Sequence, residues 1–599
     1  MEEEPQFFAH AVPETGRLLP SASRWNSIEI DFGLVPPSSN EHEDVPSKYS
    51  KSYDFDLRIA NKTQFKRFIY ISIFLILAAA AAALLASFLP HKRHHLGTSS
   101  NLPLALDHAL LFFDAQKSGA LPENNPVKFR GDSGLQDGIR KQINASLVGG
   151  FYDSGNNIKF SFPTAYTITL LSWTVIEYHQ KYAEIGQLDH IKDIIKWGSE
   201  YLLKLYIPSG STSKQALLFS QVGSSNNDTT SDNDITCWQR PEDMNYGRPV
   251  SICGSSASDL AGEMIAAMAA ASLVFEEDEA YSRSLILASE SLFELATKNK
   301  NKATYTANRE CGGEARSFYN STSYMDELVW GGTWLFFATG KFTYLKFATD
   351  NFESAVLEEL PSDRGLFYWN NKIAATAVLL ARLRYLHDPG YPYEETLKNC
   401  SAMANKLACS YLHLSATFRA TPGGMPLPRP NGSAPLQYAT TAAFLSKIYS
   451  DYLNIIQIPG GSCSTFSFSL DMLQDFSRLE VNYILGDNPL KMSYLVGFGD
   501  NFPKKVHHRA ASIAWDGRNY TCAEGKKWQE AKEPNPNVLL GAMVAGPDKD
   551  GRFLDDRDRP EFTEPTISGN AGLVAALIAL IDHPTNLGID QERIFTKIS

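Results

Sequence analysis

The chain has 599 residues, of which 43% are hydrophobic and 20% charged, so most of it can bury a core. This length exceeds one ordinary domain unless the fold is a large barrel or a solenoid, and 40 Gly with 31 Pro exclude a collagen-like or wholly disordered chain. A formal net charge of −12 argues against nucleic acid as the main partner, because phosphate binding needs a basic surface.

Residues 1–67 carry eight Lys and Arg, 11 Asp and Glu, and no apolar periodicity. This composition predicts a disordered tail. The segment that follows, residues 68–89, contains 22 residues without a formal charge. At about 1.5 Å per residue a helix of this length spans roughly 33 Å, which is enough for one bilayer crossing.

The alternatives for residues 68–89 are a signal peptide or a buried core helix. A signal peptide begins near residue 1, whereas this run follows a tail of 67 residues, and a core helix rarely runs so long with basic residues at both ends. We therefore predict a transmembrane signal-anchor helix. Lys62, Lys66 and Arg67 before it outweigh Lys92 and Arg93 after it, which favours a cytosolic N-terminus. Residues 90–104 are expected to be a linker.

The glycosylation sequons support the same orientation, because six of the seven lie after the membrane segment. They begin at Asn144, Asn227, Asn320, Asn399, Asn431 and Asn519. All seven cysteines also follow the membrane segment, so disulfides are possible, and their odd number leaves at least one unpaired within the chain. These observations predict a single-pass type II membrane protein with its large domain lumenal or extracellular. Plasma, Golgi and endosomal membranes are the expected locations, among which the sequence does not choose.

From residue 105 to 585, apolar segments with helical spacing alternate with loops rich in Gly, Pro, Asn and Asp. No alternation of strands and helices and no dinucleotide motif appears. This pattern predicts an all-α domain, which a helical barrel or solenoid explains best, followed by a C-terminal extension over 586–599. The clearest predicted helices are Ala165–Tyr182, Ser258–Phe275, Leu328–Ala338, Lys372–Leu386, Thr440–Leu453 and Gly572–Ile581.

Three loops between these helices carry candidate chemistry. The loop 149–160 is glycine-rich and contains Asp153, which could project into a cleft or merely cap a turn. The loop 553–571 contains Glu564 before Pro565, which could be an ordinary helix-start acid. The loop 493–509 ends in two histidines and an arginine, which could bind phosphate, a metal or sugar hydroxyls.

Together these loops resemble glycoside hydrolase family nine, the inverting endo-β-1,4-glucanases. The order of tail, membrane helix and catalytic domain is similar to the plant membrane-anchored, Korrigan-type branch. Further similar segments begin at Arg130, Cys237, Tyr324, Leu436, Tyr483 and Gly541. The resemblance covers residues 105–585 and implies an (α/α)6 barrel.

Inverting hydrolysis needs one carboxyl to protonate the leaving oxygen and another to activate water, roughly 6.5–9.5 Å apart. By resemblance, Glu564 is the general acid, and Asp153 is the first aspartate of the loop that holds the water. The second aspartate of that loop is the principal base of the family, and this chain has Asn156 there. An amide orients water but accepts no proton, so we expect a slow enzyme.

The resemblance also assigns roles to residues around the two carboxyls. His507 and Arg509 would bind glucosyl hydroxyls, and the Asp-x-Arg pair of Asp555 and Arg557 would position the acid. Stacking on sugar rings is assigned to three aromatic residues that each have a core alternative: Trp238, Tyr324 and Trp330. The chain departs from the usual family residues at Phe129, Asn370 and Arg559-Pro560.

These observations leave three hypotheses for function. The first is an endo-β-1,4-glucanase (a cellulase) of cell-wall biogenesis, slowed by Asn156. The second is a catalytically impaired glucan-binding partner of a cellulose-synthesising complex, and the third is a scaffold without a sugar site. We expect no cofactor, and no clustered Cys and His spacing predicts a metal site, although a calcium site is left open.

Overall fold

The computed structural model describes residues 63, 66–67, 70–74 and 101–598, with gaps at 141–142, 145, 211–214, 225–231, 299, 413–418, 422–424, 428–433, 465–466 and 583–587. The predicted tail and the predicted membrane helix lie almost wholly outside these residues. Among the described residues, no helix is long and apolar enough to cross a membrane. The chain divides into two compact units, Met1–Lys92 and Arg93–Ser599, and every element below belongs to the second.

Six helices of the described domain form an inner ring. They are α3 (Ser161–Glu184), α5 (Ser258–Val274), α9 (Met325–Thr339), α11 (Ile373–Leu386), α13 (Leu436–Ile455) and α18 (Ile567–Leu580). Each helix packs on the next in this order, and α18 packs back on α3, so the ring closes. Every residue of α5 is buried, and five of the six residues 266–271 are alanine. Such small side chains let neighbouring helix backbones approach closely.

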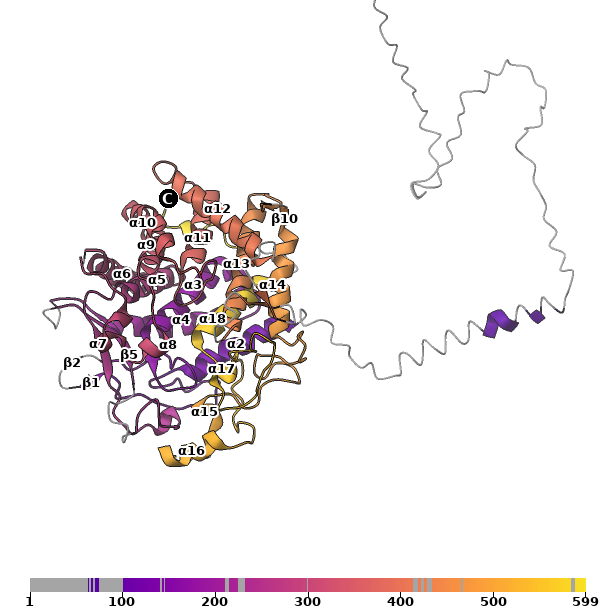
Figure 1. The fold of residues 1–599 in the computed structure, drawn as a ribbon, viewed down its shortest axis with the longest axis horizontal. Helices are drawn as coiled ribbons and strands as arrows, with labels where there is room; N and C mark the ends of the chain where they lie inside the picture. Colours follow the sequence, from indigo (N-terminus) through magenta and orange to yellow (C-terminus); the bar gives the residue numbers. More distant parts are fainter. Residues whose placement is uncertain are drawn as a thin grey trace, which may run out of the picture. The chain divides into compact units, whose positions relative to one another are not determined.

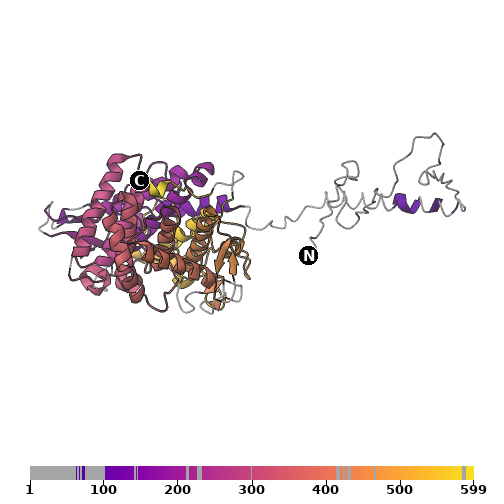
Figure 2. The same cartoon turned by 90° about the horizontal axis from the view of Figure 1, so that it is seen from above.

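A second set of helices covers the inner ring. They are α4 (Leu188–Lys204), α6 (Glu279–Lys298), α10 (Phe342–Glu358), α12 (Glu394–Tyr411), α14 (Leu470–Ile484) and α2 (Leu102–Gln116). Each packs mainly on one inner helix, in the pairs α3/α4, α5/α6, α9/α10, α11/α12, α13/α14 and α18/α2 (Figures 1 and 2). The outer helices are amphipathic, as α4 illustrates by burying Ile191, Ile194 and Leu202 on one face. The predicted (α/α)6 barrel is thereby confirmed.

The remaining elements are short and lie between the barrel helices. One antiparallel sheet joins β3 (Lys159–Phe160), β4 (Tyr206–Ile207) and β6 (Val250–Cys253) to β5 (Leu217–Val222), with Lys159 opposite Val222 and Leu218 opposite Cys253. The two-stranded pairs are β1 (Ile139–Arg140) with β2 (Ile143–Asn144), β7 (Arg419–Ala420) with β8 (Pro426–Leu427), and β9 (Gly460–Ser462) with β10 (Ser467–Ser469). The short helices are η3 (Pro241–Asp243), η4 (Tyr305–Ala307), α7 (Arg309–Gly312), α8 (Ala315–Phe318), α15 (Arg509–Ser512), α16 (Cys522–Glu530), α17 (Pro560–Thr563) and η5 (Arg593–Phe595).

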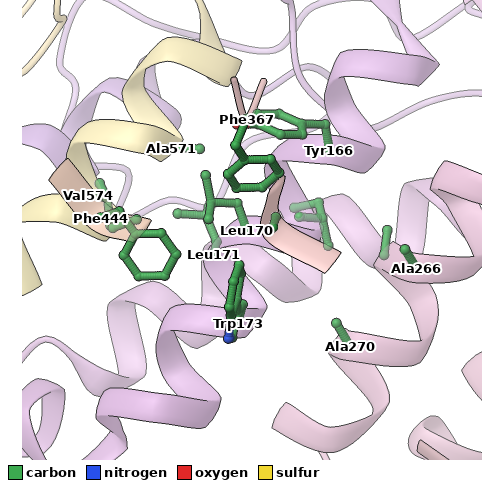
Figure 3. Packing of buried hydrophobic residues seen from close by; sticks show 14 of the residues in the cluster. Tyr166, Leu170, Leu171, Trp173, Ala266, Ala270, Phe367, Phe444, Ala571 and Val574 are labelled. Atoms are coloured by element: carbon green, nitrogen blue, oxygen red, sulfur yellow. The ribbon is translucent and has the colours of Figure 1, made fainter. Parts of the chain in front are cut away.

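Side chains from opposite sides of the inner ring fill its centre. Figure 3 shows Trp173 of α3 close to Leu171 and Phe444, with Val574 of α18 nearby. The Trp173 ring lies 5.0 Å from that of Phe444 and 5.8 Å from that of Trp330. Trp330 is fully buried in this cluster, so its core alternative holds and the stacking role predicted for it is wrong.

A cluster of charged side chains is buried inside the same ring. Lys372 Nζ lies 3.0 Å from Glu263 Oε2 on α5 and 3.4 Å from Glu327 Oε1 on α9. It also donates a hydrogen bond to the Trp369 carbonyl at 2.6 Å. Burial raises the pKa of Glu263 to about 7, and the nearby Lys372 ammonium opposes that rise. The ammonium therefore offsets the cost of burying two carboxyls.

We expect Lys372→Met to lower the free energy of unfolding by about 3–5 kcal/mol, because it leaves two buried carboxyls without a cation. Chemical denaturation followed by circular dichroism measures this change. Lys346→Met is the control, since Lys346 pairs with Asp350 at 2.6 Å on the exposed face of α10 and its loss should change little. Equal losses in the two variants would contradict the role given to Lys372.

Three disulfides link segments of the domain, namely Cys237–Cys522, Cys253–Cys311 and Cys409–Cys463. Cys400 is buried and unpaired, in agreement with the odd number of cysteines. Such bonds persist in oxidising compartments.

The C-terminal residues 588–598 pack on the barrel, although they were predicted to lie in an extension outside it. Arg382 of α11 donates from Nη1 to Glu177 Oε2 at 2.8 Å and from Nη2 to the Asp590 carbonyl at 2.6 Å. Ile594 of η5 is fully buried, and η5 contacts α3 and α9. The predicted boundary at residue 585 therefore separates no structural unit.

Candidate active site

The loops that contain Asp153 and Glu564 lead into α3 and α18, which are neighbours in the inner ring. The Asp153 N–H donates to the Ile158 carbonyl at 3.0 Å, which closes the first loop on itself. The Asp153 carbonyl accepts from the N–H of Ile567, the first residue of α18, at 3.0 Å. The barrel thus brings together two loops that are about 400 residues apart in the sequence.

A buried glutamine holds the backbone on both sides of Asp153. Gln116, the last residue of α2, donates from Nε2 to the carbonyls of Tyr152 at 3.0 Å and Ser154 at 2.8 Å. Its Oε1 pairs with His508 Nε2 at 2.8 Å, while His508 Nδ1 accepts from the Ala511 N–H at 3.1 Å. Burial keeps the pKa of His508 well below its usual range, so this histidine is a neutral structural group.

The Asp153 carboxyl is buried and only half satisfied. Oδ2 accepts a hydrogen bond of 2.6 Å from the Tyr319 hydroxyl, whereas Oδ1 is buried without a hydrogen-bond partner among the described residues. Burial raises the pKa of Asp153 to about 7; the Tyr319 hydrogen bond opposes the rise and the Glu564 charge adds to it. Asp153 is therefore a carboxyl that exchanges a proton near neutral pH.

Glu564 follows the short helix α17, and its N–H donates to the Pro560 carbonyl at 3.0 Å. Its Oε1 accepts two hydrogen bonds from the Asp153 loop, from Ser154 Oγ at 2.8 Å and from the Gly155 N–H at 3.1 Å. Its Oε2 makes no hydrogen bond to any described residue. One oxygen is thus fixed to the loop and the other is available to a ligand.

The segment from His507 to Arg509 packs directly against the Asp153 loop. A Cβ added to Gly155 would lie 1.9 Å from the His507 carbonyl oxygen, so only glycine fits there. His507 Nδ1 lies 2.6 Å from the Arg557 carbonyl, which makes Nδ1 the protonated nitrogen. The Nε2 atom of this half-buried ring is left for a ligand.

Asn156 is turned back onto its own loop. Its Oδ1 accepts from the Ile158 N–H at 2.9 Å, and its Nδ2 donates to Ser154 Oγ at 2.9 Å. The position predicted for the principal base therefore holds an amide whose two polar atoms both serve the turn.

Arg509, predicted to bind sugar hydroxyls, and Arg557, predicted to position the acid, both donate hydrogen bonds to neighbouring chain segments. Arg509 is buried and donates to three backbone carbonyls, those of Cys237 at 2.9 Å, Gly155 at 3.1 Å and Asp234 at 3.0 Å. Arg557 donates from all three nitrogens to the 528–535 segment, including 2.7 Å to the Trp528 carbonyl. These contacts make Arg509 a positioning group, which corrects its predicted sugar-binding role, while Arg557 holds the 528–535 segment.

The other predicted residues lie at different depths around the site. Both oxygens of Asp555 accept from backbone, the N–H groups of Lys504 at 2.8 Å and Lys505 at 2.9 Å, so Asp555 positions the segment that leads to His507. Trp238 is only 2% exposed and meets the His507 ring edge-on at 4.8 Å, so it supports that ring and has no free face for a sugar. Tyr324 precedes α9 and is half-buried.

Tyr319, Ser154 and Gln116 contact the site but were not predicted from the sequence. Tyr319 is 166 residues from Asp153 and lies just after the four-residue helix α8. No periodicity or motif connects such residues. A polar residue inside the Asp153 loop was the only available signal for Ser154.

Three predicted glycosylation sites have exposed asparagines, Asn320, Asn399 and Asn519. The side chains of the other three sites, at residues 144, 227 and 431, lie outside the described residues. No group of three or more His, Cys, Asp and Glu among the described residues could hold a metal ion.

Comparison with known proteins places this geometry in a family. Residues 103–577 match the model of "Glycosyl hydrolase family 9". The chain belongs to glycosyl hydrolase family 9. It is 45% identical over 520 residues to "Endoglucanase 10" of Oryza sativa subsp. japonica, an alignment that covers 86% of this chain and 83% of the rice protein.

Solved structures of family 9 agree with the barrel. The endoglucanase of the termite Nasutitermes takasagoensis is 32% identical, with a TM-score of 0.67 over 80% of this chain and 98% of the termite chain. Endoglucanase CelQ of Clostridium thermocellum, solved with cellobiose and cellotriose, is 28% identical, with a TM-score of 0.62 over 80% of this chain and 70% of the CelQ chain. The prediction that this family 9 protein is an endoglucanase is confirmed.

For this endoglucanase we expect Tyr319→Phe to lower kcat about fivefold or more at pH 6 and less above pH 8. The lost hydrogen bond stabilises the ionised form of Asp153, so the acidic limb of the pH–rate profile should move to higher pH. Initial rates on a soluble β-1,4-glucan between pH 4 and 9 measure both effects. Tyr178→Phe is the control, because Tyr178 donates to Asp451 at 2.9 Å away from the site. A loss of equal size at every pH would contradict this role.

Proposed function

We propose that this protein hydrolyses internal β-1,4-glucosidic bonds of cellulose-like glucan with inversion, during cell-wall biogenesis and at a low rate. Glu564 is the general acid and Asp153 the general base. The observation that carries the proposal is the junction of the two loops, which fixes one oxygen of Glu564 and leaves Asp153 Oδ1 unpartnered.

In this mechanism, the proton on Glu564 Oε2 passes to the glycosidic oxygen as the bond from C1 to that oxygen breaks. Water attacks C1 from the opposite face and gives its proton to Asp153. Solvent then returns a proton to Glu564 and removes one from Asp153. His507 Nε2 accepts a hydrogen bond from a glucosyl hydroxyl, because its other nitrogen is held by the Arg557 carbonyl.

The low rate follows from Asn156. Loss of a general base costs about 10²–10⁴ in rate, or roughly 3–5 kcal/mol. Asp153 recovers part of this activity because it is a carboxyl of the same loop. Each polar atom of Asn156 makes one hydrogen bond within the turn, and an amide accepts no proton, so Asn156 cannot replace the missing base.

The test is hydrolysis of a soluble cello-oligosaccharide by the purified domain, followed by NMR of the newly formed reducing end. We expect the α-anomer to appear first, with Glu564→Gln as the blank for contaminating cellulase. Initial release of the β-anomer, or equal release by the blank, would refute the proposal.

The second candidate is a glucan-binding partner of a cellulose-synthesising complex, which the amide at position 156 favours. Both candidates bind glucan, but the second does not hydrolyse it. Calorimetric binding of cello-oligosaccharides by a protein that releases no reducing ends over hours would select it.

We further propose that residues 68–89 anchor the protein in the membrane as a type II protein, with the catalytic domain lumenal or extracellular. The three disulfides and the exposed Asn320, Asn399 and Asn519 support an oxidising, glycosylating compartment. Plasma, Golgi and endosomal membranes all meet these conditions.

We expect glycosidase treatment to increase the gel mobility of the protein made in a plant host. In sealed microsomes, added protease should remove the N-terminal tail and spare the catalytic domain. A protected tail together with an unglycosylated domain would reverse the proposed orientation.

A further inference from the structure

Three side chains form a hydrogen-bonded series that ends at the acid. Asn156 Nδ2 donates to Ser154 Oγ at 2.9 Å, and Ser154 Oγ lies 2.8 Å from Glu564 Oε1. The orientation of the amide is fixed, because its other end accepts from the Ile158 N–H, which can only donate. Ser154 therefore accepts from Asn156, and its single proton points to Glu564.

The same Glu564 oxygen accepts a second hydrogen bond, 3.1 Å from the Gly155 N–H. With two donors on Oε1, the proton that Glu564 transfers resides on Oε2. Ser154 is 4% exposed and has no room to contact a substrate itself. Its hydroxyl therefore acts through the two carboxyls: it donates to Glu564, and its interaction with Asp153 partly opposes the raised pKa of that group.

We propose that Ser154 is a positioning residue for the acid and that Asn156 orients its hydroxyl, so that the two residues work as one unit. This rests on the proposed function of Glu564 as the acid. The amide at position 156 thus has a task of its own, because it supplies the N–H that directs the Ser154 proton.

An aspartate at position 156 breaks this unit. A carboxylate has no N–H to donate, so the single Ser154 proton then faces two acceptors, the new carboxylate and Glu564. If Ser154 donates to the new carboxylate at position 156, that carboxylate becomes a weaker base, and Glu564 loses the hydrogen bond that positions it. The contribution of the Ser154 hydroxyl to kcat therefore depends on which residue occupies position 156.

A double-mutant cycle tests this dependence, with native protein, Ser154→Ala, Asn156→Asp and the double variant. Beside the native Asn156, Ser154→Ala should lower kcat about five- to tenfold, leave KM within about twofold and move the basic limb of the pH–rate profile to higher pH. In the Asn156→Asp background, Ser154→Ala should cause no loss or a gain. Ser410→Ala on the outer helix α12 is the control for loss of a serine hydroxyl.

Losses of equal size in the two backgrounds would overturn the proposal, as would an effect confined to KM. Crystal structures of native protein and Ser154→Ala test the positioning role without any measurement of enzyme activity. We expect Glu564 to lose its single side-chain conformation in the variant, and an unchanged Glu564 would also overturn the proposal. If no protein of the cycle cleaves glucan while Glu564 does move, the proposed function fails and the positioning role stands.

Discussion

Asp153→Asn is expected to lower kcat on a soluble β-1,4-glucan by about 10²–10⁴. With Asn156 already an amide, this variant leaves no carboxylate in the loop that faces the water. The backbone contacts that hold residue 153, to Ile158 and Ile567, do not depend on the side chain and should persist. The loss should therefore appear in kcat with little change in KM.

The pH dependence identifies the group responsible. Because burial raises the pKa of Asp153 to about 7, native activity should increase with pH up to about 7, and this limb should be absent from the variant. A raised folded-state pKa also means that the Asp153 contribution to stability is complete below about pH 4 and is lost as the pH rises through about 7. Asp153→Asn should flatten the pH dependence of the unfolding free energy across that interval.

Asp451→Asn is the matched control for Asp153→Asn. Asp451 also accepts a hydrogen bond from a tyrosine hydroxyl, that of Tyr178 at 2.9 Å, but it lies on α13 outside the candidate site. Its replacement should leave kcat nearly unchanged. Native activity in Asp153→Asn would show that another group activates the water.

Asn156→Asp is expected to raise kcat by at least about tenfold, because it places a proton acceptor where the inverting mechanism requires one. The new side chain can keep the hydrogen bond from the Ile158 N–H, so the loop should retain its shape. KM should change little, since this residue contacts water rather than sugar. Initial rates on the same soluble glucan measure the gain.

The neighbouring Asn157 offers a control of the same chemistry. Its buried Nδ2 donates to the Gln239 carbonyl at 3.0 Å, so Asn157→Asp should lose that bond without any gain in rate. A native enzyme already as fast as Asn156→Asp would mean that another group is the base. A complete lack of activity in Asn156→Asp would direct attention to Arg559-Pro560, which precedes the acid, although Pro560 sits at the first position of α17, where proline is favoured.

The sequence predicts those helices whose residues are almost all apolar, because such helices must be buried. The six helices named from apolar spacing are the six inner helices, whose residues are apolar on nearly every side. Each outer helix has one buried face and one charged face, as α4 does, so its apolar signal is weaker. The inner helix on which it packs is determined by closure of the ring rather than by its local sequence.

The candidate site was predictable where one loop contains the whole signal, as for Asp153 and Glu564. It was not predictable where the role depends on distant partners. Arg557 is buried against a segment more than 20 residues away, and the stacking role given to Trp330 failed because aromatic side chains suit the barrel centre equally well. Tyr319 reaches Asp153 only after the barrel has folded.

The pairing of α2 with α18 also constrains how the chain folds. The first helix of the domain needs the last helix of the ring as its partner, and α18 must also fit between α13 and α3. At about 5–20 residues per second of synthesis, the apolar face of α2 waits roughly 20 to 90 seconds before α18 exists. During that time the ring of helices in the nascent chain is still open, and the apolar faces at its two ends are exposed. We therefore expect folding of this protein to depend on chaperones that shield such surfaces until translation has finished.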